Sequence, residues 1–281
     1  RIAPKDQIGR WSGWGWGMGY AGGLVCLAVC LFAFVEGPLE FERKSPTNIG
    51  GAMLFVAGWF LVFSLPLMFF APDTASTGKR VRTAWRDALH QLVESVRQVG
   101  RHRMIVRFLI VHMIYTDGLA TLFTFSGIYA AGTFGMNEQQ ILVFGIALNV
   151  AAGLGSAVFA RVDDWIGSRR MILIALVGIL LPTILILAVP EQTALWIGGM
   201  TLGVFVGPLQ SASRAYLARV APQRLENQAF GLYAFSGKAT AFVGPLVVSG
   251  LTWLSGSQRV GMTPLIRFFA VGLLGMWMVP E

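Results

Sequence analysis

The sequence has little charge. Only 13% of its 281 residues are Asp, Glu, Lys or Arg, whereas 55% are hydrophobic. A soluble globular domain usually carries about 25% charged residues, so this deficit argues against such a domain. Lys and Arg outnumber Asp and Glu, 22 to 14, but they cluster between long apolar runs and form no basic polar face. This distribution predicts a membrane protein that has no nucleic-acid partner.

Cysteine and histidine are also scarce, which excludes several kinds of site. Cys26 and Cys30 lie within an apolar run, and the three histidines (His90, His102 and His112) share no ligand spacing. The sequence therefore predicts no metal site and no cofactor, and both cysteines are expected to be small buried hydrophobes. The phosphate-binding motif G-x-x-x-x-G-K-[ST] is missing as well, so this sequence carries no P-loop ATPase.

Long apolar runs are abundant. A helix needs about 20 apolar residues to cross the hydrocarbon core, and long unbroken runs favour helices over the short alternating strands of a barrel. Eight runs meet this requirement: 11–35, 50–71, 104–131, 138–160, 170–189, 193–217, 227–250 and 260–279. The fold class predicted from them is an all-α, polytopic membrane helix bundle with about eight transmembrane helices.

The connecting loops alternate in basic content. Loops 1–10, 72–103, 161–169 and 218–226 are rich in Lys or Arg. Loop 36–49 has two basic residues against three Glu, loop 251–260 has Arg259 alone, and 132–138 and 190–193 contain neither Lys nor Arg. Basic loops lie on the cytoplasmic side of a membrane. We therefore expect the basic loops and the C-terminus to be cytoplasmic.

The longest loop divides the chain into three predicted parts. Residues 1–71 would be the last two helices of an N-terminal bundle, 72–103 a cytoplasmic linker, and 104–281 a six-helix C-terminal bundle. Within the linker, apolar residues at helical spacing over 81–99 predict an amphipathic helix. This helix is interpreted either as a plain connection or as a regulatory element. A parent of six plus six spans is typical of secondary transporters, so the sequence is interpreted as a fragment that lacks four spans.

Ionisable and polar residues inside the spans are candidate functional residues. Asp117 and Lys238 are expected at matched depth, about 15 Å from the cytoplasmic side at 1.5 Å per residue. Charges within a membrane are expensive and mark functional sites. The pair could bind a polar solute or couple protons, or it could be a static salt bridge. Further candidates for the same roles are Arg267, Asn149 and His112, although these could instead snorkel outward or bond a neighbouring helix.

Glycines and prolines recur at positions that suggest packing or bending. Gly13 and Gly17 belong to one row with four-residue spacing and Gly19 to another, which predicts close approach of a neighbouring helix. The pairs Gly207–Pro208 and Gly244–Pro245 are candidate hinges, because proline removes a helical hydrogen bond. Simple packing is the alternative for both sets.

The loop 160–170, ARVDDWIGSRR, has the residues of a switching motif. Asp164 can accept hydrogen bonds from helix-end amides, and Gly167 permits a tight turn before Arg169 and Arg170. The loop resembles the major facilitator superfamily motif G-x-x-x-D-x-x-G-x-R-R, with Ala160 in place of the first glycine. In that superfamily the motif governs conformational switching and does not bind substrate. The alternative is an ordinary charged turn.

Three stretches together resemble a family. They are GRWSGWGWGMGYAGG at 9–23, YTDG at 115–118 and LQSASRAYLARVAPQRLENQAFGLYAFSGKATAFVGP at 209–245. The chain is similar over nearly its whole length to the bacterial branch of the vacuole effluxer family, within the major facilitator superfamily. The resemblance implies a major facilitator-type fold with the equivalents of helices 5–12. Because the similarity is to the bacterial branch, it also implies a location in the inner (plasma) membrane of a bacterium.

The resemblance also implies a function. The expected activity is secondary active transport of a small polar solute by alternating access, with amino acids as the solutes of the fungal branch. The expected partners are that solute and the lipid bilayer, the full-length protein is expected to be monomeric, and no enzymatic activity is expected. The alternatives are a non-transporting membrane scaffold or inactive fragment, and a membrane enzyme that would use Ser236 and Lys238.

Overall fold

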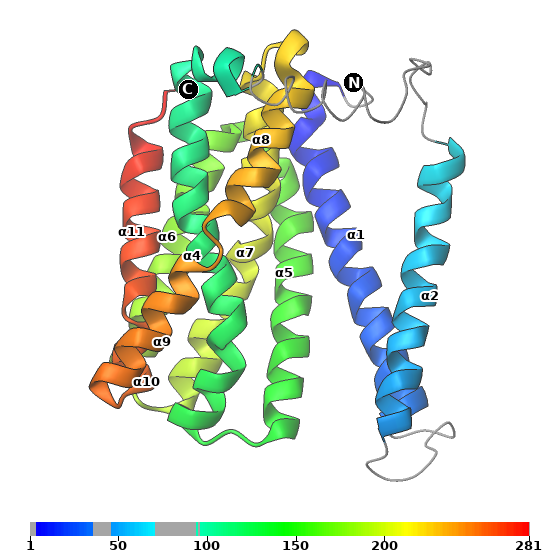
Figure 1. Ribbon diagram of the computed structural model, residues 1–281, viewed down its shortest axis with the longest axis vertical. Helices are drawn as coiled ribbons and strands as arrows, with labels where there is room; N and C mark the ends of the chain where they lie inside the picture. Colours follow the sequence, from blue (N-terminus) through cyan, green and yellow to red (C-terminus); the bar gives the residue numbers. More distant parts are fainter. Residues whose placement is uncertain (1–3, 36–45, 71–93, 95, 281) are drawn as a thin grey trace. The chain divides into compact units, whose positions relative to one another are not determined.

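The described part of the protein is mostly helical. The computed structural model describes residues 4–35, 46–70, 94 and 96–280, and no strand occurs among them (Figure 1). The described residues belong to two compact units, 1–18 with 88–281 and 19–87. The predicted all-α class is therefore confirmed.

The larger unit is a helix bundle. Its elements are η1 (Lys5–Gln7), the first part of α1 (Ile8–Val29), α4 (Arg103–Phe134), α5 (Glu138–Ile166), α6 (Ser168–Ala188), α7 (Gln192–Val220), η3 (Gln223–Leu225), α8 (Glu226–Ala239), α9 (Val243–Ser255), α10 (Gln258–Met262) and α11 (Pro264–Trp277). Helix α7 packs along α5 and α6, while α4 packs along α8, α9 and α11.

The smaller unit contains the rest of α1, the π-helical stretch η2 (Cys30–Val35) and α2 (Pro46–Phe70). No described side chain of α2 is buried, and a helix that is apolar on all sides is typical of a membrane span. Cys26 and Cys30 are free thiols of intermediate exposure, so the expectation that both are buried is wrong. Most of the predicted amphipathic helix, 81–99, lies outside the described residues.

Seven stretches are long and apolar enough to cross a membrane: Gly50–Phe70, Arg103–Phe134, Gln139–Ile166, Ser168–Ala188, Gln192–Val220, Gln223–Ser255 and Gln258–Trp277. They match seven of the eight predicted spans. The eighth prediction, 11–35, is helical but is not among the seven, because Gly and Trp residues lower the hydropathy of its first half. The chain is thus a multi-pass integral membrane protein.

The core of the larger unit lies between its helices, and large apolar side chains cover the outer surface of the bundle. Phe108 and Tyr115 of α4, Leu209 of α7 and Phe269 of α11 are fully or almost fully buried. Large apolar residues such as Trp253, which is 83% exposed, lie on the outside. Helices in a bilayer pack through such internal contacts while their apolar outer surface faces lipid.

The predicted hinge and packing glycines separate into different roles. Helix α7 continues without interruption through Gly207 and Pro208, and a Cβ on Gly207 would meet Ala152 O and Ser156 Oγ of α5. Gly207 therefore permits close packing and does not mark a break. The span 223–255 does break, between α8 and α9, and Gly244 with its following proline lies in the first turn of α9.

Candidate functional site

A single glycine joins α5 to α6. Gly167 is the only residue between the two helices, and its backbone has φ +89° and ψ 146°. Residues with a Cβ are strained in this region of backbone space, so the turn requires glycine there. The turn holds Asp164 at the last turn of α5 and Arg169 at the first turn of α6.

Replacing Gly167 with alanine is expected to lower the stability of the protein. Forcing a Cβ into this backbone conformation costs about 1–3 kcal/mol. Thermal unfolding of the detergent-purified variant measures the loss. Gly250→Ala is the matched control, because a Cβ on Gly250 has no neighbour within 4 Å. Equal melting temperatures for the two variants would contradict the strain argument.

Asp164 caps the first turn of α1. Its Oδ1 accepts from the backbone N–H of Gly9 at 2.8 Å, and its Oδ2 accepts from the N–H of Arg10 at 3.0 Å. The Arg10 side chain lies beside the same carboxylate, with Nε 3.8 Å from Oδ2. The free N–H groups and positive end of a helix dipole favour a carboxylate at this position. Asp164 therefore ties α5 to the start of α1.

Arg219 completes this cluster from the last turn of α7. Its Nη2 bonds Asp164 Oδ1 at 2.8 Å, and its Nη1 donates to Asp163 Oδ1 at 3.2 Å and Ser168 Oγ at 2.6 Å. The side chain of Asp163 is 2% exposed. Neither Arg219 nor Asp163 was predicted as a site residue. The adjacent pair of carboxylates in the loop was the available signal, since two buried anions need a cation nearby.

The arginines of the motif extend the contacts to the end of α11. Arg169 Nη2 donates to the backbone carbonyl of Trp277 at 2.7 Å. Arg170, the next residue of α6, is exposed. Together with Asp164 and Arg219, the motif thus connects α1, α5, α6, α7 and α11 at one end of the bundle, which the loop charges predict to be cytoplasmic.

The glycine row of α1 continues this contact along α5. A Cβ on Gly13 would lie 2.5 Å from Ala160 Cβ, and a Cβ on Gly17 would lie 3.4 Å from Gly153 O. Gly19 has no neighbour within 4 Å among the described residues. The predicted close approach therefore holds for Gly13 and Gly17, whereas Gly19 belongs to the smaller unit.

Asp117 and Lys238 do not meet. Asp117 is buried in α4, with 3% exposure, and its carboxylate accepts from the backbone N–H of Gly244. Lys238 is exposed on the last turn of α8 and forms no ion pair among the described residues. The expected pairing is thus not formed in this structure. The reason is the break after α8, which brings a residue beyond Lys238 against Asp117.

His112 lies in a buried polar and aromatic cluster on α4. Its Nδ1 is 3.0 Å from Ser236 Oγ of α8, and its ring stacks on Tyr233 with centroids 4.1 Å apart. One turn along, Tyr115 Oη is 2.7 Å from Ser213 Oγ of α7. These contacts join α4 to both α7 and α8. The sequence indicated His112 but not its partners, which come from helices more than 90 residues away.

Arg214 is a further cation that the sequence analysis did not single out. It lies on α7, five residues before Arg219, and it is exposed. Its guanidinium is 6.0 Å from the ring centroid of Phe230 on α8. Five residues of helix correspond to about 7.5 Å, so Arg214 lies deeper in the span than the cluster around Asp164.

The remaining predicted site residues lie elsewhere. Asn149 is exposed on α5 and donates to the carbonyl of Gly145 in its own helix at 2.9 Å. Arg267 is exposed on α11 and has no ion pair among the described residues. Neither residue is brought to Asp117 or His112 by an observed contact. The assignment of both residues to a site therefore remains a prediction.

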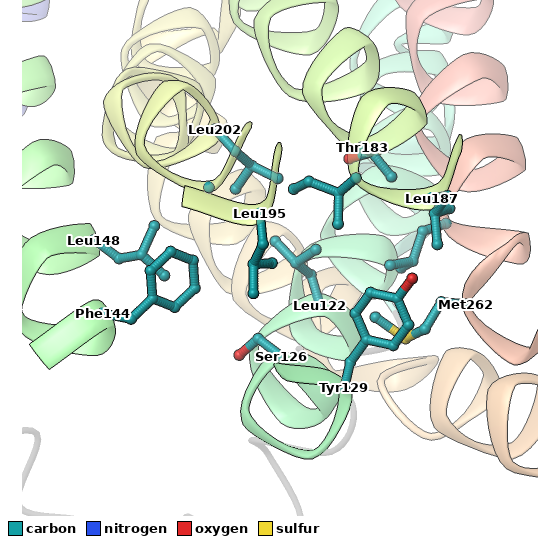
Figure 2. Close-up of a pocket in the computed structure, with 13 residues that line it drawn as sticks. Leu122, Ser126, Tyr129, Phe144, Leu148, Thr183, Leu187, Leu195, Leu202 and Met262 are labelled. Carbon is teal, nitrogen blue, oxygen red and sulfur yellow. The ribbon is translucent and has the colours of Figure 1, made fainter. Parts of the chain in front are cut away.

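An apolar cavity of about 50 Å³ lies among α4, α5, α6, α7, α10 and α11. Figure 2 shows Leu122 and Tyr129 of α4, Phe144 of α5, Leu195 of α7 and Met262 of α10 around it. The cavity contains none of the predicted polar site residues, so it does not belong to the candidate site. Among the described residues, no group of three His, Cys, Asp or Glu side chains could hold a metal ion.

Comparison with known proteins identifies the family. The family model described as "Vacuole effluxer Atg22 like" matches residues 5–281. An uncharacterized MFS-type transporter, YxiO of Bacillus subtilis (strain 168), is 23% identical over 100% of this chain and 65% of its own length. Autophagy-related protein 22 of Cryptococcus neoformans is 24% identical over 93% of this chain and 51% of its own length.

Autophagy-related protein 22 of Saccharomyces cerevisiae (strain S288c) is 22% identical over 86% of this chain and 51% of its own length. The chain thus spans less than two thirds of the length of these curated relatives. The match of the family model to almost every residue agrees with the motifs at 9–23, 115–118 and 209–245. The chain belongs to the vacuole effluxer Atg22-like family.

Proposed function

We propose that the protein acts as a secondary transporter that moves a small polar solute across a bacterial plasma membrane by alternating access. One observation carries this proposal: a charged cluster ties α1, α5 and α7 together at one end of a multi-pass bundle. The names of the relatives, an MFS-type transporter and autophagy-related protein 22, support it. Both termini would be cytoplasmic, and the complete protein would work as a monomer.

The cluster around Asp164 would be the cytoplasmic gate. Asp164 and Arg219 connect the first turn of α1 to α5 and α7, and the glycines of α1 allow close contact along α5. If α1 belongs to one bundle and α5 to the other, these contacts close the cytoplasmic end. Opening that end requires the charged hydrogen bonds to break, which makes the cluster a two-state element.

The solute would carry a carboxylate, as amino acids do. Arg214 and Lys238 are exposed cations within spans, and neither has an ion-pair partner among the described residues. Asp117 does not neutralise them, because its carboxylate bonds the backbone of Gly244. Charges at membrane depth face a cavity or a partner. An anionic group of the solute would supply that partner, and a coupling ion or the solute gradient would drive movement.

A vesicle experiment tests the proposal. The protein, with any segment that its gene encodes beyond residues 1–281, is reconstituted in vesicles, and uptake of labelled amino acids and other organic acids is measured. We expect saturable uptake that is inhibited by carboxylates and not by neutral amides. Binding without movement would instead favour a scaffold.

Neutralising the two exposed cations is expected to weaken the solute interaction. Arg214→Gln and Lys238→Gln should each raise the half-saturating concentration about tenfold, because an ionic hydrogen bond contributes about 1.5–3 kcal/mol. Arg224→Gln is the matched control, since Arg224 is exposed in η3 and lies outside the helices that carry the cations. An equal effect of all three variants would indicate general surface charge and contradict a carboxylate site.

The enzyme alternative is less well supported. Ser236 Oγ donates to the carbonyl of Tyr233 at 2.9 Å and contacts His112 at 3.0 Å. Lys238 is exposed two residues further on. Neighbours two residues apart on a helix do not face each other, so Lys238 is poorly placed to activate the Ser236 hydroxyl.

A further inference from the structure

We propose that Asp117 is an inter-helix cap whose negative charge fixes the break in the span 223–255. In this role the carboxylate, on α4, holds the N-terminus of α9 and does not form a salt bridge with Lys238. The cap itself is a property of the fold. Its part in transport, as the element that releases α9 when Asp117 takes up a proton, rests on the function proposed above.

The break lies where the span would otherwise cross as one helix. Helix α8 ends at Ala239, residues 240–242 form a turn, and α9 begins at Val243. Figure 1 shows α8 and α9 as separate helices joined by an irregular stretch beside α4. A helix that starts within the membrane exposes free N–H groups, and no water is present in the hydrocarbon core to accept from them.

Each early amide of α9 is accounted for. The N–H of Val243 donates to the carbonyl of Thr240 at 2.8 Å, and Pro245 has no N–H to satisfy. The N–H of Gly244 lies between them and donates to Asp117 Oδ1 at 3.3 Å and Oδ2 at 3.2 Å. Asp117 thus supplies from another helix the acceptor that an N-cap side chain normally supplies from its own.

The local shape fits this contact. A Cβ on Gly244 would collide with Thr121 Oγ1 and would lie 3.1 Å from Asp117 Oδ1. Thr121 donates its hydroxyl to the carbonyl of Asp117 at 2.7 Å, which holds Thr121 against the same turn of α4. Only glycine at position 244 lets the start of α9 approach the carboxylate so closely.

The helix end also compensates the charge of Asp117. Its carboxylate is buried and has no ion pair among the described residues, and an isolated charge at this depth is expensive. The positive end of the α9 dipole offsets part of that cost. Helix α9 has no titratable residue. The titratable and charged groups on the elements packed against α4 and α9, and on α4 itself, are Arg103, Arg107, His112, Tyr115 and Tyr129 on α4, Glu138, Arg161, Asp163 and Asp164 on α5, Arg214, Tyr216 and Arg219 on α7, Glu226, Tyr233 and Lys238 on α8, Arg259 on α10, and Arg267 on α11.

Protonation of Asp117 would weaken the cap. The neutral carboxyl loses its attraction to the helix end, and charge-assisted hydrogen bonds are about twice as strong as neutral ones. The contact should therefore be strong where Asp117 is ionised and weaker as the pH falls and the carboxyl takes up a proton. Release of the start of α9 would let the outer part of the span move relative to α8.

Hydrogen–deuterium exchange of the purified protein tests the cap without any solute. We expect Asp117→Asn, which keeps the size and one acceptor, to raise exchange of amides 243–250 about tenfold. Lys238→Gln is the matched control and should leave exchange within about twofold of wild type. Wild-type exchange in this segment, corrected for intrinsic rates, should rise as the pH is lowered, whereas Asp117→Asn should have lost that dependence.

Each outcome bears on the proposal. Unchanged exchange in Asp117→Asn, or an equal rise in Lys238→Gln, would overturn the cap. If Asp117→Asn does not fold, the wild-type pH series decides, and the absence of a pH-dependent rise would overturn it. Because exchange needs no solute, a failed transport assay with the expected exchange pattern would reject the transporter function and leave the cap intact. Observed transport with unaltered exchange would reject the cap alone.

Discussion

Replacing Asp164 with alanine is expected to open the contact between α1 and α5. The substitution removes the acceptor of the Gly9 and Arg10 amides and leaves Arg219 with one carboxylate fewer. The Asp164 side chain is 8% exposed, and breaking a buried ion pair from one side costs about 3–5 kcal/mol. Partial exposure of Arg219 reduces this figure, so we expect a loss of about 2–3 kcal/mol in the closed contact.

Cysteine accessibility measures this opening. Ser12, on α1, donates to Ser211 O of α7 at 2.8 Å, so a cysteine at position 12 reports on the contact after Cys26 and Cys30 are replaced by alanine. Its labelling by a membrane-impermeant maleimide should be at least about tenfold faster in Asp164→Ala, because about 1.4 kcal/mol corresponds to a factor of ten.

The control for this experiment is another acid in a loop. Glu191→Gln removes an exposed carboxylate beside α7, far along the helix from Arg219. Labelling at position 12 should not change in this variant. If Asp164→Ala is labelled as slowly as Glu191→Gln, the Asp164 carboxylate does not hold α1 in place. The cluster around Asp164 would then not be the gate.

The fold could largely be predicted from the sequence, because hydrophobic run length is a local property. Seven of the eight spans match within a few residues. The first run, 11–35, is helical as predicted, but its mean hydropathy is too low for it to count among the candidate spans. The stretch GWGWGMG at 13–19 lowers that hydropathy. The single-residue turn at Gly167 was also predictable, because the residue type itself indicates an unusual backbone conformation.

The candidate site was harder to predict, because its contacts are long-range. Depth along a helix predicts that Asp117 and Lys238 lie within the bilayer, and both lie in stretches long and apolar enough to cross it. Depth gives no information on which helix face is turned inward. The partner of Asp117 is a backbone N–H 127 residues away, and backbone groups leave no mark on side-chain patterns. Arg219 was overlooked for a related reason, since it looks like an ordinary basic residue at a helix end.

The two predicted aspartates turn out to share one structural role. Asp164 accepts from the first turn of α1, and Asp117 accepts from the first turn of α9. In each case a carboxylate of one helix holds the N-terminus of another. These contacts depend both on the charge of the carboxylate and on the direction of the capped helix. When that helix tilts, its hydrogen bonds to the carboxylate can therefore break together. This property suits the two positions to conformational switching better than a plain salt bridge would.

The second large effect is expected at the crossing of α5 and α7. A Cβ on Gly155 would collide with the backbone carbonyl of Val204. Backbone atoms cannot move aside as a flexible side chain can, so Gly155→Ala must push the two helices apart. Overpacking costs about 1–3 kcal/mol, and occasionally more, when the surroundings cannot adjust.

Gly145→Ala on the same helix is the matched control, since a Cβ there has no neighbour within 4 Å. Alanine is a better helix former than glycine by about 1 kcal/mol, so this control should melt at the wild-type temperature or slightly above. We expect Gly155→Ala to melt well below it, in thermal unfolding of protein in detergent. A Gly155→Ala variant as stable as the control would show that α5 and α7 do not cross this closely. The larger Gly155→Leu should then also fold, whereas the observed crossing predicts that no folded Gly155→Leu protein is recovered.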